Sequence, residues 1–185
     1  MDQWLNLCKA TTEKIRGRAR EVLLGMEGLM KEIITFFISG REYGIEISGM
    51  QSLESYQEIH PLSEAPDCIL GTIVVRDEVY PVYDLRAKLN LPAAEMTKDT
   101  KILLLRTSKR GIACMVDSVD KVFQAEGDNI QIFPKEAQTA GTDYIDFIAR
   151  RDGELIVVIN PDTLMSEEDF DIMNELDLSQ EEKQE

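Results

Sequence analysis

Most of the chain consists of short apolar runs separated by turn residues, a pattern typical of antiparallel β-structure. Between Ile33 and Ile159 the runs fall into four pairs, and three to five turn-forming residues separate the two runs of each pair. Closely spaced pairs of this kind fold as β-hairpins. The pattern therefore predicts a nearly all-β domain with hairpins at residues 36–47, 69–83, 101–116 and 144–159.

The four hairpins form two sets in the same order along the chain. Three markers recur, namely a glycine in a second arm, an Arg-Asp turn and a polar helix cap: Gly44 and Gly111, Arg76-Asp77 and Arg151-Asp152, Asp84 and Asn160. Paired hairpins leave open sheet edges, and closure into a ring removes those edges. The pattern therefore predicts a pseudo-repeat of two small barrels with about five strands each.

The first 31 residues follow a different period. Apolar side chains from Leu5 to Ile33 recur at alternating steps of three and four, the spacing that keeps one stripe on one face of a helix. The three glycines in this stretch weaken such a helix by about 1 kcal/mol each relative to alanine, so the helix needs a surface to pack against. Two surfaces remain open for this amphipathic helix over residues 1–31: its own domain, or a helix of another chain in a homo-oligomer or partner.

Negative charge is concentrated at the end of the chain. Residues 166–185 carry nine acidic and one basic side chain, which is more than half of the net charge of −15. Because dense like charge with few apolar residues opposes folding, we expect a largely disordered tail after about residue 170. Only a weak helical patch is expected there, at Phe170, Met173 and Leu176. The overall charge also repels phosphate backbones, which argues against nucleic-acid binding.

The apolar runs are too short for a transmembrane helix, which needs roughly 20 residues. The first residues lack the basic start, apolar stretch and cleavage site of a signal peptide, so the sequence predicts a cytoplasmic protein without membrane insertion. Three cysteines without CxxC spacing (Cys8, Cys68 and Cys114) indicate reduced thiols rather than a disulfide framework or a zinc site.

The sequence offers little material for catalysis. The one histidine, His60, precedes Pro61 in a loop, which favours a solvated side chain over a catalytic base. Cys114 alternates with apolar neighbours on one strand face and is expected to be a core thiol. The carboxylates match no calcium loop and no glycine-rich loop suits a phosphate, so we expect no metal, no cofactor and no enzyme activity. An enzyme using paired carboxylates is the distant alternative.

Residues 66–86 carry the most informative local pattern. Gly71 permits a close backbone approach within a buried strand, which leads to a charged turn at Arg76-Asp77. Pro81 stands in the return strand, where proline requires an edge or a bulge. Asp84 then caps a short helix.

This stretch resembles the signature of the CheW family, the scaffold proteins of bacterial chemosensory arrays. The family pattern runs from a proline through a glycine-bearing strand and an arginine-glycine turn to an apolar-proline-apolar step and Asp-Leu-Arg. The matching positions are Pro66, Ile69, Gly71, Ile73, Arg76, Pro81, Val82, Asp84, Leu85 and Arg86. Residues 111–119 and 144–164 resemble a later strand and the closing hairpin of the family, so the resemblance covers about residues 32–165.

Three positions depart from the family pattern. Asp77 stands where the family usually has glycine after the arginine, Phe147 replaces another glycine, and Asn160 replaces an aspartate. Asp77 therefore either avoids a positive φ or bears strain there. These positions lie in turns and on surfaces, so they bear on partner choice more than on fold.

The resemblance implies two intertwined SH3-like five-stranded barrels with short helices and a shared apolar seam over residues 32–165. It also implies a non-enzymatic adaptor that couples the regulatory domain of a CheA-type histidine kinase to the cytoplasmic helical tip of a chemoreceptor. Arg76 is the first candidate for partner binding, with Gly71 and Asp77 beside it, and the alternative for Arg76 is an ordinary solvated arginine. The alternative function is a CheW-fold scaffold outside chemotaxis that self-associates or pairs through its N-terminal helix.

Overall fold

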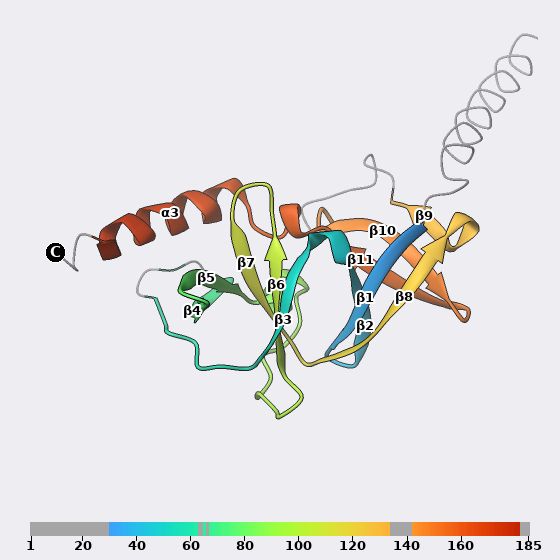
Figure 1. Ribbon diagram of the computed structural model, residues 1–185, viewed down its shortest axis with the longest axis horizontal. Coiled ribbons are helices and arrows are strands. Elements are labelled where there is room, and N and C mark those ends of the chain that lie inside the picture. Colours follow the sequence, from blue (N-terminus) through green and yellow to red (C-terminus); the bar gives the residue numbers. More distant parts are fainter. Residues whose placement is uncertain (1–29, 63–64, 66, 134–141, 182–185) are drawn as a thin grey trace, which may run out of the picture.

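The computed structural model describes residues 30–62, 65, 67–133 and 142–181, with side chains up to Asn174 in the last helix. Within these residues the chain forms two sheets and a few short helices (Figure 1). The first sheet has the strand order β8 (Ser118–Glu126), β1 (Met30–Ile38), β2 (Arg41–Glu46), β11 (Glu154–Ile159), β10 (Ile145–Arg151) and β9 (Ile130–Ile132). The second has the order β3 (Met50–Ser55), β6 (Lys101–Arg106), β7 (Gly111–Val116), β5 (Glu78–Tyr83) and β4 (Ile69–Val75).

Short helical segments connect the strands or follow them. The α-helices are α2 (Leu85–Lys88) and α3 (Glu167–Glu181), and the 3-10 turns are η1 (Ile47–Gly49), η2 (Gly127–Asn129) and η4 (Pro161–Thr163). Asp84 caps α2, because its carboxylate accepts a hydrogen bond from the backbone N–H of Arg86 at 2.9 Å. Asn160 caps η4 in the same way, with Pro161 at the first position. Both predicted caps are confirmed.

The four predicted hairpins are confirmed as β1–β2, β4–β5, β6–β7 and β10–β11. Each sheet takes one hairpin from each half of the chain. The hairpins join through two parallel pairings, β2 with β11 and β5 with β7. The chain therefore begins in the first sheet, builds the second, and returns to complete the first, which makes the two sheets intertwined.

The pseudo-repeat is confirmed in topology, but its residue correspondence differs from the prediction. Both later hairpins have a register shift at the same place, between Ile69 and Gly71 in one and between Ile145 and Phe147 in the other. The ladders then match the turn at Arg76-Asp77 with the turn after Arg151, which is formed by Asp152 and Gly153. The predicted correspondence of Arg76-Asp77 with Arg151-Asp152 was therefore one residue too early in the later hairpin, because a recurring Arg-Asp pair does not fix the register of a ladder.

Apolar side chains form three clusters. One lies between the sheets and takes residues from both, including Phe36 and Ile45 of the first sheet and Leu103 and Cys114 of the second. The other two clusters belong to one sheet each. Strands such as β6 are consequently buried on both faces, which explains the continuous apolar run Ile102–Leu105.

Two predictions at the ends of the domain are corrected. Residues 1–29, which hold most of the predicted helix, lie outside the described residues, but Met30, Lys31 and Ile33 belong to strand β1. The predicted helix therefore does not include these three residues, because β1 pairs with both β2 and β8 and this ladder overrides the helical spacing.

A largely disordered tail was predicted after residue 170, whereas the described residues form helix α3 up to Glu181. Phe170 and Met173 are 3% and 0% exposed and join the cluster between the sheets. Ser166 and Asp169 form a reciprocal capping box, in which each side chain accepts a hydrogen bond from the backbone N–H of the other. Two buried anchors and a good cap outweigh the unfavourable local charge. Leu176 lies outside the described side chains.

Candidate functional site

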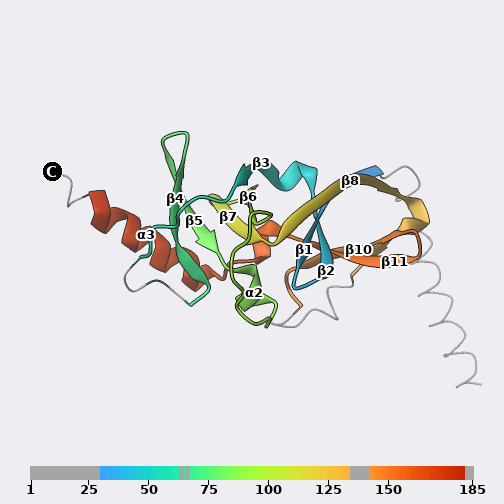
Figure 2. The same ribbon diagram turned by 90° about the horizontal axis from the view of Figure 1, so that it is seen from below.

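The hairpin of β4 and β5, called the Arg76 hairpin below (Ile69–Tyr83), projects from the second sheet (Figure 2). Arg76 and Asp77 form its tip, both exposed and both with positive φ, 54° and 67°. The sequence left open whether Asp77 avoids a positive φ, and the structure shows that it does not. A two-residue turn with two positive φ values matches the twist of the flanking strands.

Just below the tip, Val74 and Val79 face each other across the two strands. They are 51% and 52% exposed, although both are aliphatic. An apolar pair of this kind, with the charges of Arg76, Asp77 and Glu78 around it, has the composition of a protein interface, where an apolar centre is surrounded by a polar rim.

A small hollow lies beside the tip, and Tyr80 is one of its lining residues. The hydroxyl of Tyr80 donates a hydrogen bond to the Glu78 carboxylate and accepts one from Gln51 Nε2 at 2.8 Å. The bond to Glu78, together with burial, raises the pKa of Tyr80. The hollow has a volume of about 190 Å³ and is lined by Gln51, Ser52, Val75, Arg76, Glu78, Tyr80 and Leu104. Strand β3 therefore contributes two residues, Gln51 and Ser52, that the sequence did not single out.

Gly71 lies inside the fold rather than on the exposed face. Its φ is +146°, and a Cβ atom at this position would stand 2.2 Å from the carbonyl oxygen of His60. His60 and Thr72 form a β-bridge at this point, with both N···O distances at 2.8 Å. This close approach is the one that the glycine was predicted to permit. The placement of Gly71 in a partner surface stays a prediction.

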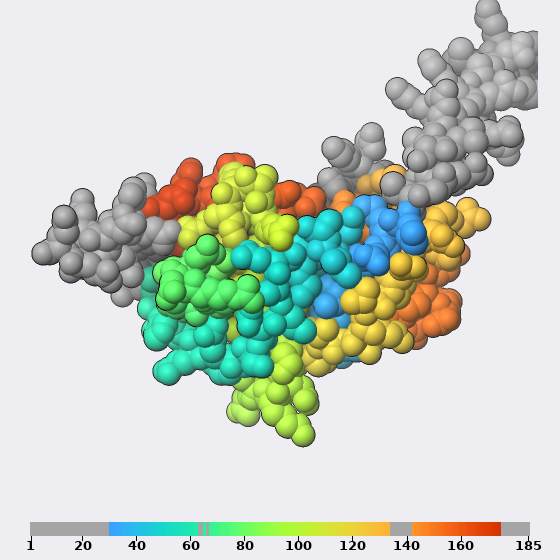
Figure 3. Space-filling model, in the orientation of Figure 1, coloured from blue at the N-terminus to red at the C-terminus, as the bar shows by residue number. Residues whose placement is uncertain are grey.

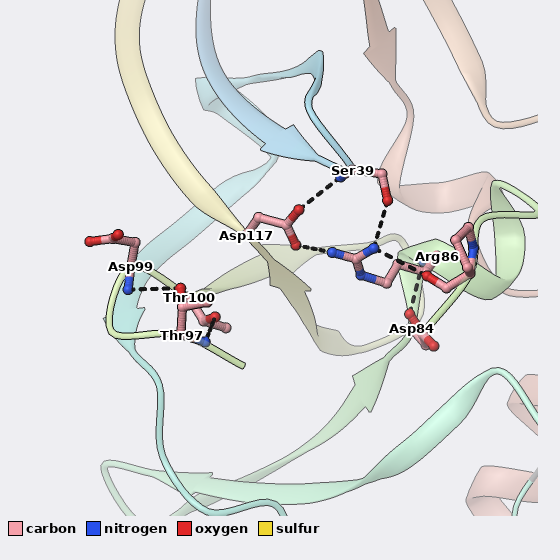
Figure 4. Close-up of polar contacts among 8 residues, drawn as sticks. Ser39, Asp84, Arg86, Thr97, Asp99, Thr100 and Asp117 are labelled. Atoms are coloured by element: carbon pink, nitrogen blue, oxygen red, sulfur yellow. Dashed lines mark hydrogen bonds and ion pairs between the residues drawn. The ribbon is translucent and has the colours of Figure 1, made fainter. Parts of the chain in front are cut away.

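The other arginine of the motif, Arg86, is buried between the two sheets (Figure 4). Its guanidinium pairs with the Asp117 carboxylate and donates to Ser39 Oγ at 2.7 Å and to the Pro92 carbonyl at 3.2 Å. Asp117 also accepts a hydrogen bond from the backbone N–H of Ser39 at 2.8 Å. The network joins the β1–β2 turn, α2 and the β7–β8 corner, so Arg86 holds the sheets together while Arg76 remains exposed.

Comparison with known proteins identifies the family. The model for the CheW-like domain matches residues 32–169. The chain belongs to the CheW-like family. A chemotaxis protein CheW from Klebsiella aerogenes is 25% identical over 158 residues, which cover 85% of this chain and 95% of the relative. A chemotaxis protein CheW from Bacillus subtilis is 28% identical over 138 residues, covering 75% and 88%.

A solved structure shows the same fold. The scaffolding protein TtCheW from Thermoanaerobacter tengcongensis superposes with a TM-score of 0.69 at 24% identity, over 76% of this chain and 96% of that one. The resemblance deduced from residues 66–86 is thus confirmed. The chain is a CheW-like chemotaxis scaffold or adaptor, and the family is non-enzymatic.

The described part of this CheW-like chain holds no group of three His, Cys, Asp or Glu side chains that could bind a metal ion. His60 is exposed and contributes its backbone to the bridge with Thr72. Among the helices of the described residues, none has both the length and the apolar character needed to cross a membrane.

The thiol of Cys68 is expected to react slowly with alkylating reagents. Burial, and then the nearby Asp169 carboxylate, raise its pKa from 9.0 to about 11. Only the thiolate reacts, so its rate at pH 8 should be about 100-fold below that of an ordinary cysteine and should keep rising about tenfold per pH unit beyond pH 9. Mass spectrometry of the iodoacetamide-treated peptide measures this, and a plateau near pH 9 would contradict it.

Proposed function

We propose that this CheW-like chain couples the regulatory domain of a CheA-type histidine kinase to the cytoplasmic helical tip of a chemoreceptor, and that the Arg76 hairpin is part of its partner surface. The observation that carries the proposal is the exposed Val74–Val79 pair beneath the charged tip. Arg76 is the main contact, and Asp77 lies beside it. Gly71 supports the surface from within, because it lets the His60 segment lie against β4.

The proposed action is mechanical rather than chemical. An adaptor that fixes the kinase relative to the receptor helices lets a small shift of the receptor change the population of active kinase. This requires a rigid body between the two contacts. The Arg86–Asp117 pair and the cluster shared by both sheets supply that rigidity, because they join elements of both sheets.

The finer fold assignment belongs to the same proposal. We propose that each sheet curls into an SH3-like barrel around its own apolar cluster, and that the third cluster is the seam between the barrels. The second sheet has the five strands predicted for such a barrel, whereas the first has six. The separate clusters support this, since one is contained in each sheet and one is shared. A cytoplasmic location and a possible homo-oligomer through residues 1–31 also remain proposals.

The Arg76→Glu variant tests the partner surface. Charge reversal at the tip should weaken binding to the kinase regulatory domain or the receptor tip by at least about tenfold, because it places a like charge against the group that Arg76 pairs with. The free energy of unfolding should change by no more than about 0.5 kcal/mol, since the side chain is exposed. Calorimetric titration and thermal melting measure the two effects.

The matched control is Lys98→Glu, an equal charge change at another exposed position. It should bind both partners like the wild type. If Arg76→Glu also binds like the wild type, the hairpin is not the contact. If the wild type binds neither partner, the adaptor proposal itself is wrong.

A further inference from the structure

Helix α3 lies along the second sheet, against the turn between β6 and β7 (Figures 1 and 3). Among its described side chains, Phe170 and Met173 are the buried ones, and they enter the cluster between the sheets. Their spacing of three residues places both on one face of the helix. The side chains of Glu167, Glu168, Asp171 and Asn174 are exposed. The described part of the helix is thus attached through a single narrow face.

Lys109, in the turn between β6 and β7, holds the first turn of α3 in two ways. Its ammonium group pairs with the Glu167 carboxylate and lies 4.6 Å from the centroid of the Phe170 ring. Asp162 holds this β6–β7 turn in place, because its carboxylate accepts a hydrogen bond from the backbone N–H of Ser108. The side chains of Lys109 and Glu167 are 38% and 86% exposed, so water and salt weaken their attraction.

Several features oppose the attachment of α3. A helix of 15 residues is only marginally stable by itself, so docking must supply most of its stability. Residues 166–185 supply −8 of the net charge of −15, so the rest of the chain, which carries −7, repels them. The docked position of α3 therefore depends on its two buried side chains and on the contacts of Lys109.

Helix α3 also forms one wall of a groove of about 520 Å³. Asn174 of α3 lies there with Arg110 and Gly111, and Gln51 and the Glu78–Tyr80 flank of the Arg76 hairpin supply the other lining residues. Glu78 and Tyr80 also line the hollow next to Arg76. Asn174 of α3 therefore narrows this groove on its Tyr80 side, while Val79 stays 52% exposed with α3 in place.

We propose that α3 is a displaceable cover, held by Lys109, which opens while the two sheets stay folded and which, when closed, restricts partner access to the groove beside Tyr80 at the base of the Arg76 hairpin. Its effect on partners rests on the proposed function, whereas its opening does not. A minor open state with a population of about 0.1–10% would respond to changes of a single contact. For a partner that requires the open state, the apparent Kd is the intrinsic Kd divided by the open fraction.

Hydrogen exchange of the full chain tests the opening. Amides of α3 should exchange at least about 100-fold faster than those of Leu103 and Leu104 in β6, and still at least about tenfold slower than in an unstructured peptide.

The Lys109→Gln variant should speed exchange in α3 several-fold, because it removes the contacts with Glu167 and Phe170, and should leave exchange in β6 unchanged. Lys121→Gln is the matched control, because it removes another exposed ion pair, with Asp120, on a strand of the first sheet. This control should leave α3 unchanged. If α3 exchanges as slowly as β6, if it is unprotected, or if Lys109→Gln behaves like Lys121→Gln, there is no displaceable cover.

Calorimetric titration with the kinase regulatory domain and with the receptor tip tests the second half of the proposal. Lys109→Gln should bind the partner that contacts the hairpin at least about threefold more tightly than Lys121→Gln does. Equal affinities, with exchange in α3 accelerated, would show that α3 opens but does not restrict the hairpin. If Arg76→Glu binds both partners with wild-type affinity, the proposed partner surface is wrong, but the proposal that α3 opens is not affected.

Discussion

Gly71→Ala is expected to lower the free energy of unfolding by about 4 kcal/mol. The added Cβ would stand 2.2 Å from the His60 carbonyl oxygen and 2.8 Å from a methyl group of Ile59. Relief requires movement of backbone, which costs about 1–3 kcal/mol for an overpacked site. The φ of +146° adds about 1–3 kcal/mol, because L side chains rarely adopt it. Urea denaturation measures the sum.

Two other glycines of the chain separate the steric cost from the backbone cost. Gly40 and Gly153 also have positive φ, 72° and 88°, but a Cβ there would meet nothing within 4 Å. Alanine at either position should cost only about 1 kcal/mol. If Gly71→Ala costs no more than these two variants, the close approach of His60 is not what requires glycine at position 71.

Asp117→Ala is expected to destabilise the chain by about 3 kcal/mol. The change leaves the Arg86 guanidinium, whose side chain is 9% exposed, without its carboxylate partner. Removal of one partner of a buried ion pair costs about 3–5 kcal/mol, and the lower end applies because Asp117 is itself 37% exposed. The backbone N–H of Ser39 also loses its acceptor. Chemical denaturation of the purified variant gives the value.

A double-mutant cycle shows whether the loss comes from the pair. In the Arg86→Met background, Asp117→Ala should cost about 1 kcal/mol, the value of the remaining hydrogen bond, because no buried cation is then left unpaired. The destabilisation by Asp117→Asn in the wild-type background should lie between these two values, because asparagine keeps an acceptor oxygen but loses the charge. Equal costs in both backgrounds would mean that Arg86 and Asp117 act independently.

The four hairpins could be predicted because their information is local. A two-residue turn such as Asp152-Gly153 stands directly between the strands that it joins. Strand β3 could not be predicted in this way, because its partner β6 follows about 50 residues later. Strand β8 likewise pairs with β1, almost 90 residues earlier. Turn residues do stand beside both strands, at Ser48-Gly49 and Gly127–Asn129, but these turns do not join the strands to their partners. Charged or polar residues also interrupt the apolar alternation of both strands.

The residues of the candidate site also differ in whether local sequence or distant pairing positions them. Arg76 and Asp77 belong to a local turn, and the sequence placed them at its tip. Gln51 reaches Tyr80 only because the ladder of β3 on β6 carries it there. The two anchors of α3 were noticed as a pattern, but composition alone gave no sign that a buried cluster lay within reach. Elements defined by contacts close in sequence could therefore be predicted. Elements whose position depends on a strand or surface far away in the sequence could not.

The parallel pairing of β2 with β11 has a consequence for the newly made protein. Val157, Val158 and Ile159 pair with Tyr43, Gly44 and Ile45, so more than 110 residues must be added after β2 before its partner strand exists. At about 5–20 residues per second, the ribosome needs about 6–23 s for this. During that time β2 offers an unpaired strand edge next to apolar side chains, which invites pairing with a neighbouring nascent chain. The intertwined connection thus makes the unfinished polypeptide the form most exposed to aggregation, and a chaperone that covers residues 30–46 would protect it most.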